Sequence, residues 1–353
     1  MKYLKNVSLY GEITDIGIEN GKIAFIGKTE EQGQDFSGLR AYPGLIDIHS
    51  HGCIGYDLMD EEDNLGEMAD FELSQGITTW YPTTTTNSRD EIIAACKKNI
   101  NIGHGANILG FHLEGPFINA KHKGAQNENN IIKPDMSLFN ACDNAKLITL
   151  APEIEGAMEF IENCPAVTVL GHSDATYEVA KEAYERGVRS ITHTFNAMAG
   201  IHHREPGAIG AGSDDGRVYA QLISDGKHVH PSAVRMLVKL FGEDRIVLIS
   251  DSMQAAGKSD GEYILGGLHV TVTNGYAYTD DGHLAGSTST LSDCVRCAVS
   301  FGIPEPVAVK MASENPARLM GLNKGKIEVG YDADIVLVKD DFRVVKAIVR
   351  GEF

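Results

Sequence analysis

Residues 41–51 read AYPGLIDIHSH, a short apolar run that ends in two histidines. From Gly76 onward the chain repeats one plan, in which an apolar run ends in a polar residue and a loop and a helical stretch follow. The further runs are GITTWYPT (76–83), ANILGFHLE (106–114), AKLITLAPE (145–153), AVTVLGH (166–172), VRSITH (188–193), RVYAQLISDG (217–226) and RIVLIS (245–250). Such alternation predicts eight parallel strands joined by crossover helices.

The helical stretches carry recognisable end signals. Ser88 and Glu91 have the spacing of a capping box, and Gly187 directly follows AKEAYER as a stop. Eight strand–helix units fill roughly the 250 residues of a (β/α)8 barrel. An open doubly wound sheet is the alternative, but no glycine-rich dinucleotide loop follows the first strand. We therefore predict an α/β fold, with a (β/α)8 TIM barrel as the catalytic domain over residues 43–322.

The two ends of the chain have a different pattern. Residues 1–42 contain KYLKNVSLY, GEITDIGIE and KIAFIG, with Asn20-Gly21 as a hairpin turn. Residues 323–353 contain KGKIEVG, ADIVLVK and RVVKAIVRG. Because neither end buries much apolar surface alone, we expect 1–42 and 323–353 to pair into one small β-sandwich domain.

The charge and the apolar segments limit the possible partners. A formal net charge of -18 repels polyanions, so nucleic acid and anionic membranes are not expected as partners. A phosphorylated substrate would need cations placed locally at its site. No apolar run reaches the length of a signal peptide or a membrane span, which predicts a cytoplasmic protein.

The six cysteines do not form the dense pattern of a disulfide scaffold. Cys294 and Cys297 make a C-x-x-C that could be redox-active or form half of a zinc site, but the sequence has no second such pair. They lie in LSDCVRCAVSFG, which resembles an ordinary amphipathic helix with Asp293 near its start. We expect reduced thiols.

Polar side chains at the ends of five predicted strands are the main functional signal. They are His49 and His51 on the first strand, Glu114 on the third, His172 on the fifth, His193 on the sixth and Asp251 on the eighth. In a barrel of this kind the carboxyl ends of all strands open onto one face. Residues at i and i+2 of a strand point to the same side, so His49 and His51 can bind one cation.

Each histidine taken alone is more often a hydrogen-bonded structural residue than a ligand. A cluster of ionisable groups in a barrel mouth is nevertheless costly unless the groups are paired or bound to metal. Imidazoles with carboxylates suit Zn²⁺, Fe²⁺, Co²⁺ or Mn²⁺ better than Mg²⁺ or Ca²⁺. Glu114 could bridge two ions, and a bound metal activates water and polarises a carbonyl, which predicts hydrolysis. Asp251 is then the general base and acid, or alternatively a helix N-cap.

A series of longer motifs along the chain resembles those of one specific family. The motifs are PGLIDIHSHG, FHLEGPFIN, GHSDAT, THTFNAM, HHREPG, SDGKHVHP, ISDSM and LAGSTSTL, in this order. They resemble the N-acetylglucosamine-6-phosphate deacetylases of the amidohydrolase superfamily, from Pro43 to the NPAR at 315–318. The terminal KGKIEVGYDADIVLV resembles the closing β-strands of amidohydrolases in general.

The resemblance implies hydrolysis of N-acetyl-D-glucosamine 6-phosphate to D-glucosamine 6-phosphate and acetate, a step of amino-sugar catabolism. It implies that Glu114, His172 and His193 are metal ligands, with Zn²⁺ the first expectation, and that Asp251 is the catalytic acid and base. Some members have another pair in place of His49 and His51 and hold one metal. The intact H-x-H of this chain favours two ions.

The resemblance also implies a substrate site. Its residues are Asn196 and Ala197 for phosphate and sugar, Arg204 and His228 for phosphate, the backbone of Leu284, Ala285 and Gly286 against the sugar, and Ala125 and Gln126 near the acetamide. The family often has histidine where this chain has Gln126, and an amide cannot carry a proton charge. The arginine resembling Arg204 comes from a neighbouring subunit, which implies a homodimer. Without the resemblance, Arg204 and Glu205 would be a surface ion pair.

Three alternatives remain open at this stage. Another amidohydrolase, such as a dihydroorotase-like or dipeptide-cleaving enzyme, could use the same barrel, although those commonly place a modified lysine where Glu114 stands. N-acetylgalactosamine 6-phosphate is a rival substrate. A sensor that binds a sugar phosphate without turnover is the third alternative, and the complete set of predicted ligands argues against it.

Overall fold

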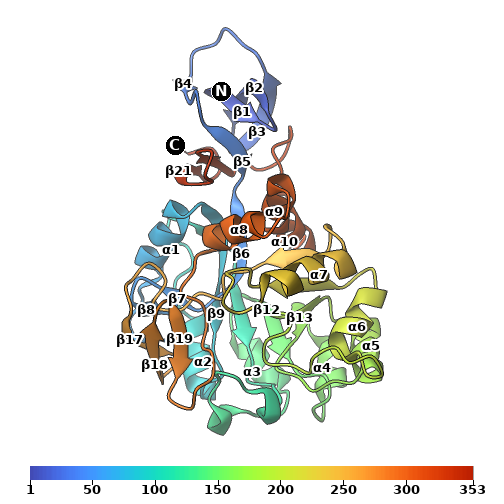
Figure 1. Ribbon diagram of the computed structural model, residues 1–353. Coiled ribbons are helices and arrows are strands. Elements are labelled where there is room, and N and C mark those ends of the chain that lie inside the picture. The colour runs from blue at the N-terminus through green and yellow to red at the C-terminus, as the bar shows by residue number, and fades with distance from the viewer. Residues whose placement is uncertain (353) are drawn as a thin grey trace.

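The structure, a computed structural model, describes residues 1–352 and has the predicted parallel barrel at its centre (Figure 1). The barrel strands are β6 (Leu45–Ser50), β9 (Ile77–Thr84), β11 (Phe111–Glu114), β12 (Ala145–Leu150), β13 (Val167–Leu170), β14 (Ser190–Ile191), β15 (Tyr219–Leu222) and β16 (Ile246–Leu248). A short strand β10 (Asn107–Ile108) also pairs with β9. Neighbouring strands from β6 to β16 pair in parallel, and the Asp251 N–H donates to the His49 carbonyl at 2.9 Å, which joins the last strand end to the first. The predicted fold class is confirmed.

Helices cover the outside of this sheet (Figure 1). They are α1 (Leu65–Ser74), α2 (Arg89–Cys96), α3 (Met136–Ala141), α4 (Ala157–Asn163), α5 (Tyr177–Arg186), α6 (Gly207–Asp214), α7 (Pro231–Phe241), α8 (Leu291–Ser300), α9 (Glu305–Met311) and α10 (Glu314–Leu319), with 3-10 turns at Ala120–His122 and Glu128–Asn130. The predicted capping box is confirmed, because Ser88 accepts from the Glu91 N–H and Glu91 accepts from the Ser88 N–H. Gly187 ends α5, as predicted. Among residues 1–352, no helix is long and apolar enough to cross a bilayer.

Both chain ends contribute to one seven-stranded sheet, which lies above the barrel in Figure 1. Its strands are β1 (Lys2–Leu9), β2 (Glu12–Glu19), β3 (Lys22–Gly27), β4 (Gln34–Asp35), β5 (Arg40–Pro43), β20 (Ile335–Val338) and β21 (Val344–Ile348). The antiparallel pair of β5 and β20 joins the two ends of the chain, with Pro43 opposite Ile335. A separate apolar core, including Leu4, Ile16 and Ile335, stabilises this unit.

One predicted strand of this region is wrong. The segment KGKIEVG (324–330) forms no strand, because Gly325 and Gly330 adopt φ of +81° and +95°, which interrupts an extended backbone. Ile327 still packs into the apolar core of the sheet. The Asn20-Gly21 hairpin is confirmed, with φ of +52° and +74° between β2 and β3.

A three-stranded antiparallel sheet follows β16 and was not predicted. It consists of β17 (Gly261–Leu265), β18 (Leu268–Thr273) and β19 (Tyr276–Thr279). The Gly266-Gly267 and Asn274-Gly275 pairs at its two turns are hairpin signals that the sequence carries. A small hairpin of β7 (Gly52–Cys53) and β8 (Tyr56–Asp57) follows β6.

Candidate active site

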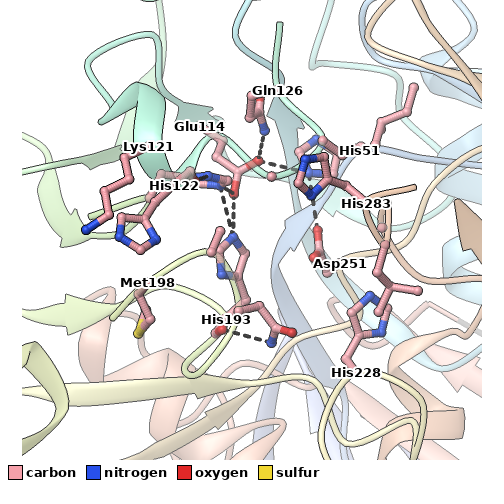
Figure 2. A pocket seen from close by; sticks show the side chains of 18 residues that line it. His51, Glu114, Lys121, His122, Gln126, His193, Met198, His228, Asp251 and His283 are labelled. Atoms are coloured by element: carbon pink, nitrogen blue, oxygen red, sulfur yellow. Dashed lines mark hydrogen bonds and ion pairs between the residues drawn. The ribbon is translucent and has the colours of Figure 1, made fainter. Parts of the chain in front are cut away.

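The six side chains predicted at the strand ends meet, with Glu114 at the centre of the group. Figure 2 labels His51, Glu114, His193 and Asp251 among them. Oε1 of Glu114 lies 3.1 Å from His172 Nε2 and 3.0 Å from His193 Nε2. The two imidazole nitrogens lie 3.2 Å from each other. Three donor atoms from β11 and from the loops after β13 and β14 therefore form a closed triangle.

A second group of donors lies on the other side of Glu114. His49 Nε2 is 3.2 Å from Glu114 Oε1, and His51 Nε2 is 3.3 Å from Glu114 Oε2. Asp251 Oδ1 lies 3.2 Å from His51 Nε2 and 3.5 Å from His49 Nε2. Glu114 is thus shared by both groups, as a bridging ligand would be.

The histidine rings are held with Nε2 facing the centre. His172 Nδ1 lies 2.8 Å from the His122 carbonyl, and His51 Nδ1 lies 3.1 Å from the Thr83 carbonyl. A carbonyl oxygen only accepts, so Nδ1 carries the proton in both rings and leaves the Nε2 lone pair for the centre. This is the ring orientation that metal-binding histidines need.

The donor set fits a transition-metal ion. Ligand atoms at about 2.0–2.1 Å from a tetrahedral zinc ion lie about 3.3 Å from one another. The donor separations in both groups are between 3.0 and 3.5 Å. His49 Nε2 is also buried and makes no hydrogen bond in the described structure, a cost that a bound cation removes.

The electrostatics of the cluster favour a positive charge at its centre. Burial by itself would raise the pKa of Glu114, but the imidazoles of His49 and His172 hold it well below its usual range. Burial would also raise the pKa of Asp251, but His49 and His51 lower it by more. Two buried carboxylates therefore remain ionised within a few ångströms of each other. Either protonated imidazole or a cation must balance them.

The backbone is strained where it aims these side chains inward. His172, His193 and Asp251 have φ of +50°, +21° and +49°, a region that costs a residue with a Cβ roughly 1–3 kcal/mol. Each of the three lies just beyond the end of its strand, where the chain turns. The alternative reading of Asp251 as a helix N-cap is wrong, because strand β17 is the next element along the chain.

A cavity of about 380 Å³ opens above the cluster. This volume is within the range of small-molecule sites. Its lining includes most of the predicted residues, namely His51, Glu114, Ala125, Gln126, His172, His193, Asn196, Ala197, His228, Asp251, Leu284 and Gly286. Although the chain as a whole is acidic, three further basic side chains line this cavity, namely Lys121, His122 and His283.

Three predicted residues do not line the cavity. His49 is fully buried beneath it. The Ala285 side chain packs into the core of the β17–β19 sheet, and its N–H donates to the Ala277 carbonyl. Arg204 is exposed, and its Nη1 lies 2.8 Å from His203 Nε2 instead of forming an ion pair with Glu205.

Gln126 contacts a predicted ligand directly. Its Nε2 donates to Glu114 Oε2, and its Oε1 accepts from the Thr86 N–H at 2.6 Å. Because both ends of the amide are engaged within the protein, Gln126 fixes the carboxylate of Glu114. Figure 2 shows it directed at Glu114, with His228 at the opposite end of the cavity.

The sequence reasoning missed two residues that support the site. His112 is fully buried, its Nδ1 lies 2.9 Å from the Ile48 carbonyl, and its ring packs edge-on against His49. It stands two positions before Glu114, so strand periodicity could have placed it on the same side. Asp225 is the second, and its Oδ2 lies 2.8 Å from His228 Nδ1. Its position three residues before His228 was the available signal.

Comparison with known proteins agrees with this geometry. The Amidohydrolase family pattern matches residues 40–353. The chain is 37% identical over 326 residues to an N-acetylgalactosamine-6-phosphate deacetylase of Escherichia coli O157:H7, covering 88% of this chain and 86% of that protein. It is 37% identical over 365 residues to an N-acetylglucosamine-6-phosphate deacetylase of Lysinibacillus sphaericus, covering 98% and 94%.

A similar solved structure is a mutant N-acetyl-D-glucosamine-6-phosphate deacetylase from Mycobacterium smegmatis in complex with N-acetyl-D-glucosamine-6-phosphate. It matches with a TM-score of 0.93 and 29% identity, over 99% of this chain and 98% of that one. The family match, the two relatives and the histidine–carboxylate cluster all indicate a hydrolytic enzyme that acts on an amide. The chain therefore belongs to the amidohydrolase family of metal-dependent hydrolases, within its N-acetylglucosamine-6-phosphate deacetylase group.

Proposed function

We propose that this enzyme removes the acetyl group of N-acetyl-D-glucosamine 6-phosphate, giving D-glucosamine 6-phosphate and acetate in amino-sugar catabolism. The observation that carries the proposal is the convergence of four imidazoles and two carboxylates at the floor of a cavity of sugar-phosphate size. The bound substrate of the Mycobacterium smegmatis relative supports the same choice.

In this proposal Glu114, His172 and His193 hold one divalent ion, and His49, His51, Asp251 and Glu114 hold a second. Imidazole-rich sites with carboxylates suit Zn²⁺ first, with Fe²⁺, Co²⁺ and Mn²⁺ as alternatives. When bound, such an ion lowers the pKa of water and polarises the acetamide carbonyl.

Asp251 is the proposed general base and acid. Its carboxylate lies at the cavity surface and is held within 3.2 Å of His51 Nε2, so its position is fixed before the substrate arrives. It accepts a proton from the attacking water and delivers it to the amide nitrogen as the C–N bond breaks. Gln126 stays neutral throughout, since an amide has no proton to exchange at ordinary pH.

The phosphate of the substrate is proposed to bind at the end of the cavity that contains Asn196, Ala197 and His228. Leu284 and Gly286, which line the cavity from the loop after β19, are proposed to border the sugar. Arg204 is proposed to reach the cavity of a neighbouring subunit in a homodimer, because its guanidinium is exposed and does not line its own cavity. We also propose a cytoplasmic location, for which the six free cysteines are the support.

N-acetylgalactosamine 6-phosphate is a second candidate substrate. The 37% identity to the Escherichia coli N-acetylgalactosamine-6-phosphate deacetylase is the observation that favours it. The two sugars differ only in the configuration of one hydroxyl group, so one metal centre and one phosphate site could accept either of them.

The test is acetate release from both sugar phosphates by purified protein whose metal content is measured in the same preparation. We expect turnover of N-acetylglucosamine 6-phosphate and its loss on chelation. If metal-loaded protein releases acetate from neither sugar, the proposed function is wrong. A preference for N-acetylgalactosamine 6-phosphate would make that compound the proposed substrate in place of N-acetylglucosamine 6-phosphate.

A further inference from the structure

Asp225 is a fully buried carboxylate that none of the steps above uses. It lies in the loop after β15, and its side chain is 0% exposed. Oδ2 accepts from His228 Nδ1 at 2.8 Å and from Ser287 Oγ at 3.2 Å. Oδ1 accepts from the backbone N–H groups of Lys227 and His228, each at 2.9 Å.

These four hydrogen bonds keep Asp225 ionised. Burial would raise its pKa, but the bonds from His228 and from the backbone lower it to about 2. A carboxylate that only accepts requires a proton on Nδ1 of the His228 ring. The other nitrogen, Nε2, is thereby left for the cavity that His228 lines, and when it carries a second proton it can donate to a phosphate oxygen there.

The same carboxylate also contacts the segment that borders the sugar. Ser287 donates its hydroxyl to Asp225 and its backbone N–H to the Asp251 carbonyl, the latter at 2.6 Å. Gly286, next to Ser287, lines the cavity with φ of +55°, and a Cβ there would come within 3.2 Å of the Asp251 carbonyl oxygen. Asp225 therefore connects the proposed phosphate end of the cavity to the segment that pairs with Asp251.

We propose that Asp225 is a positioning residue for the phosphate of the substrate. It holds the His228 ring so that Nε2 faces the cavity, and through Ser287 it fixes the wall at 284–287. This inference rests on the proposed function, because it assigns His228 to a phosphate group. It predicts that changing Asp225 lowers activity more on phosphorylated than on unphosphorylated substrates, because the loss arises mainly at His228.

The test compares N-acetylglucosamine 6-phosphate with N-acetylglucosamine for wild type, Asp225→Asn, His228→Asn and the double variant. We expect the kcat/KM ratio of phosphorylated to unphosphorylated sugar to fall about 10- to 100-fold in Asp225→Asn, as for loss of a hydrogen bond to a charged group. The lower kcat/KM should come mainly from a higher KM, with kcat little changed. The double variant should be worse than His228→Asn by no more than the smaller Ser287→Ala factor, since Asp225 acts mainly through the His228 ring.

His230→Asn is the matched control. His230 stands in the same loop, caps α7 by accepting from the Ser232 N–H, and does not line the cavity. Asparagine also caps helices well, so the ratio should stay at the wild-type value. Ser287→Ala serves if Asp225→Asn does not fold, and it should lower the same ratio by a smaller factor.

Equal losses on both sugars, or multiplicative losses in the double variant, would overturn the inference and assign Asp225 a structural role only. Those results leave the proposed function intact, because wild type still releases acetate. Failure of the wild-type enzyme on both sugar phosphates would instead reject the proposed function itself.

Discussion

Gln126 donates a hydrogen bond from its Nε2 to Oε2 of Glu114, at 2.5 Å, and so fixes the carboxylate that both groups of imidazoles share. Replacing Gln126 by Leu removes this donor and leaves the Thr86 N–H without its acceptor. We expect about a 10- to 100-fold loss of metal affinity, the usual effect of removing a partner of a ligand. Competition with a chromophoric chelator measures it. Asn129→Ala, an exposed change in the same loop, is the control, and unchanged affinity in Gln126→Leu would contradict the positioning role.

The number of bound ions depends on His51. His51→Asn removes a donor that lies 3.2 Å from Asp251 and 3.3 Å from Glu114, while Glu114, His172 and His193 remain. We expect two ions per subunit in wild type and one in the variant, measured by elemental analysis after equilibration with Zn²⁺. His104→Asn, an exposed histidine paired with Asp70, should keep two. A wild-type protein that saturates with one ion would contradict a binuclear centre.

Removal of metal should lower stability as well as activity. Glu114 and Asp251 are both buried and ionised, so the folded state without a cation carries poorly balanced charge. With free metal at 100 to 1,000 times Kd, binding stabilises the folded state by about 2.7–4.1 kcal/mol. Calorimetry with and without chelator should show a lower Tm, reversed by Zn²⁺, Fe²⁺, Co²⁺ or Mn²⁺. An unchanged Tm would argue against ions at this cluster.

Asp251→Asn should nearly abolish turnover, because an amide neither takes nor gives the proton. General acid–base catalysis contributes about 10²- to 10⁴-fold, and kcat should fall by this factor. The site formed by Glu114, His172 and His193 should still bind metal. Asp214→Asn on α6, where the carboxylate accepts from the Tyr177 hydroxyl, is the control with normal kcat. Substantial turnover in Asp251→Asn would reject its role.

Asp225 should make a pH-dependent contribution to stability. Its pKa is about 2 in the folded protein, below the usual value, so folding favours the ionised form. The contribution is therefore present above about pH 4 and is lost as the pH falls toward 2. A shift of this size corresponds to about 2 kcal/mol at neutral pH. Urea unfolding should show that the free energy of unfolding of wild type exceeds that of Asp225→Asn by more at pH 6 than at pH 3. A difference in the free energy of unfolding that does not change with pH would contradict the lowered pKa of Asp225.

The order of strands, the barrel and the six clustered residues, Glu114 among them, follow from the sequence by itself. Each of these depends on short-range patterns, namely an apolar run of strand length and the polar residue that ends it. In a closed parallel sheet, all such ends meet at one rim. Knowledge of the topology therefore suffices to bring His49, Glu114 and Asp251 together.

Only the tertiary structure decided which atoms contact one another around that rim. Gln126 contacts Glu114, Asp225 holds His228, and Arg204 lies outside its own cavity because loop paths and side-chain rotamers set these contacts. The β17–β19 sheet and the non-strand segment 324–330 likewise depend on long-range packing and on glycine φ values. Local pattern specifies where a strand ends, whereas hydrogen-bond partners distant in sequence are fixed only when the whole chain has folded.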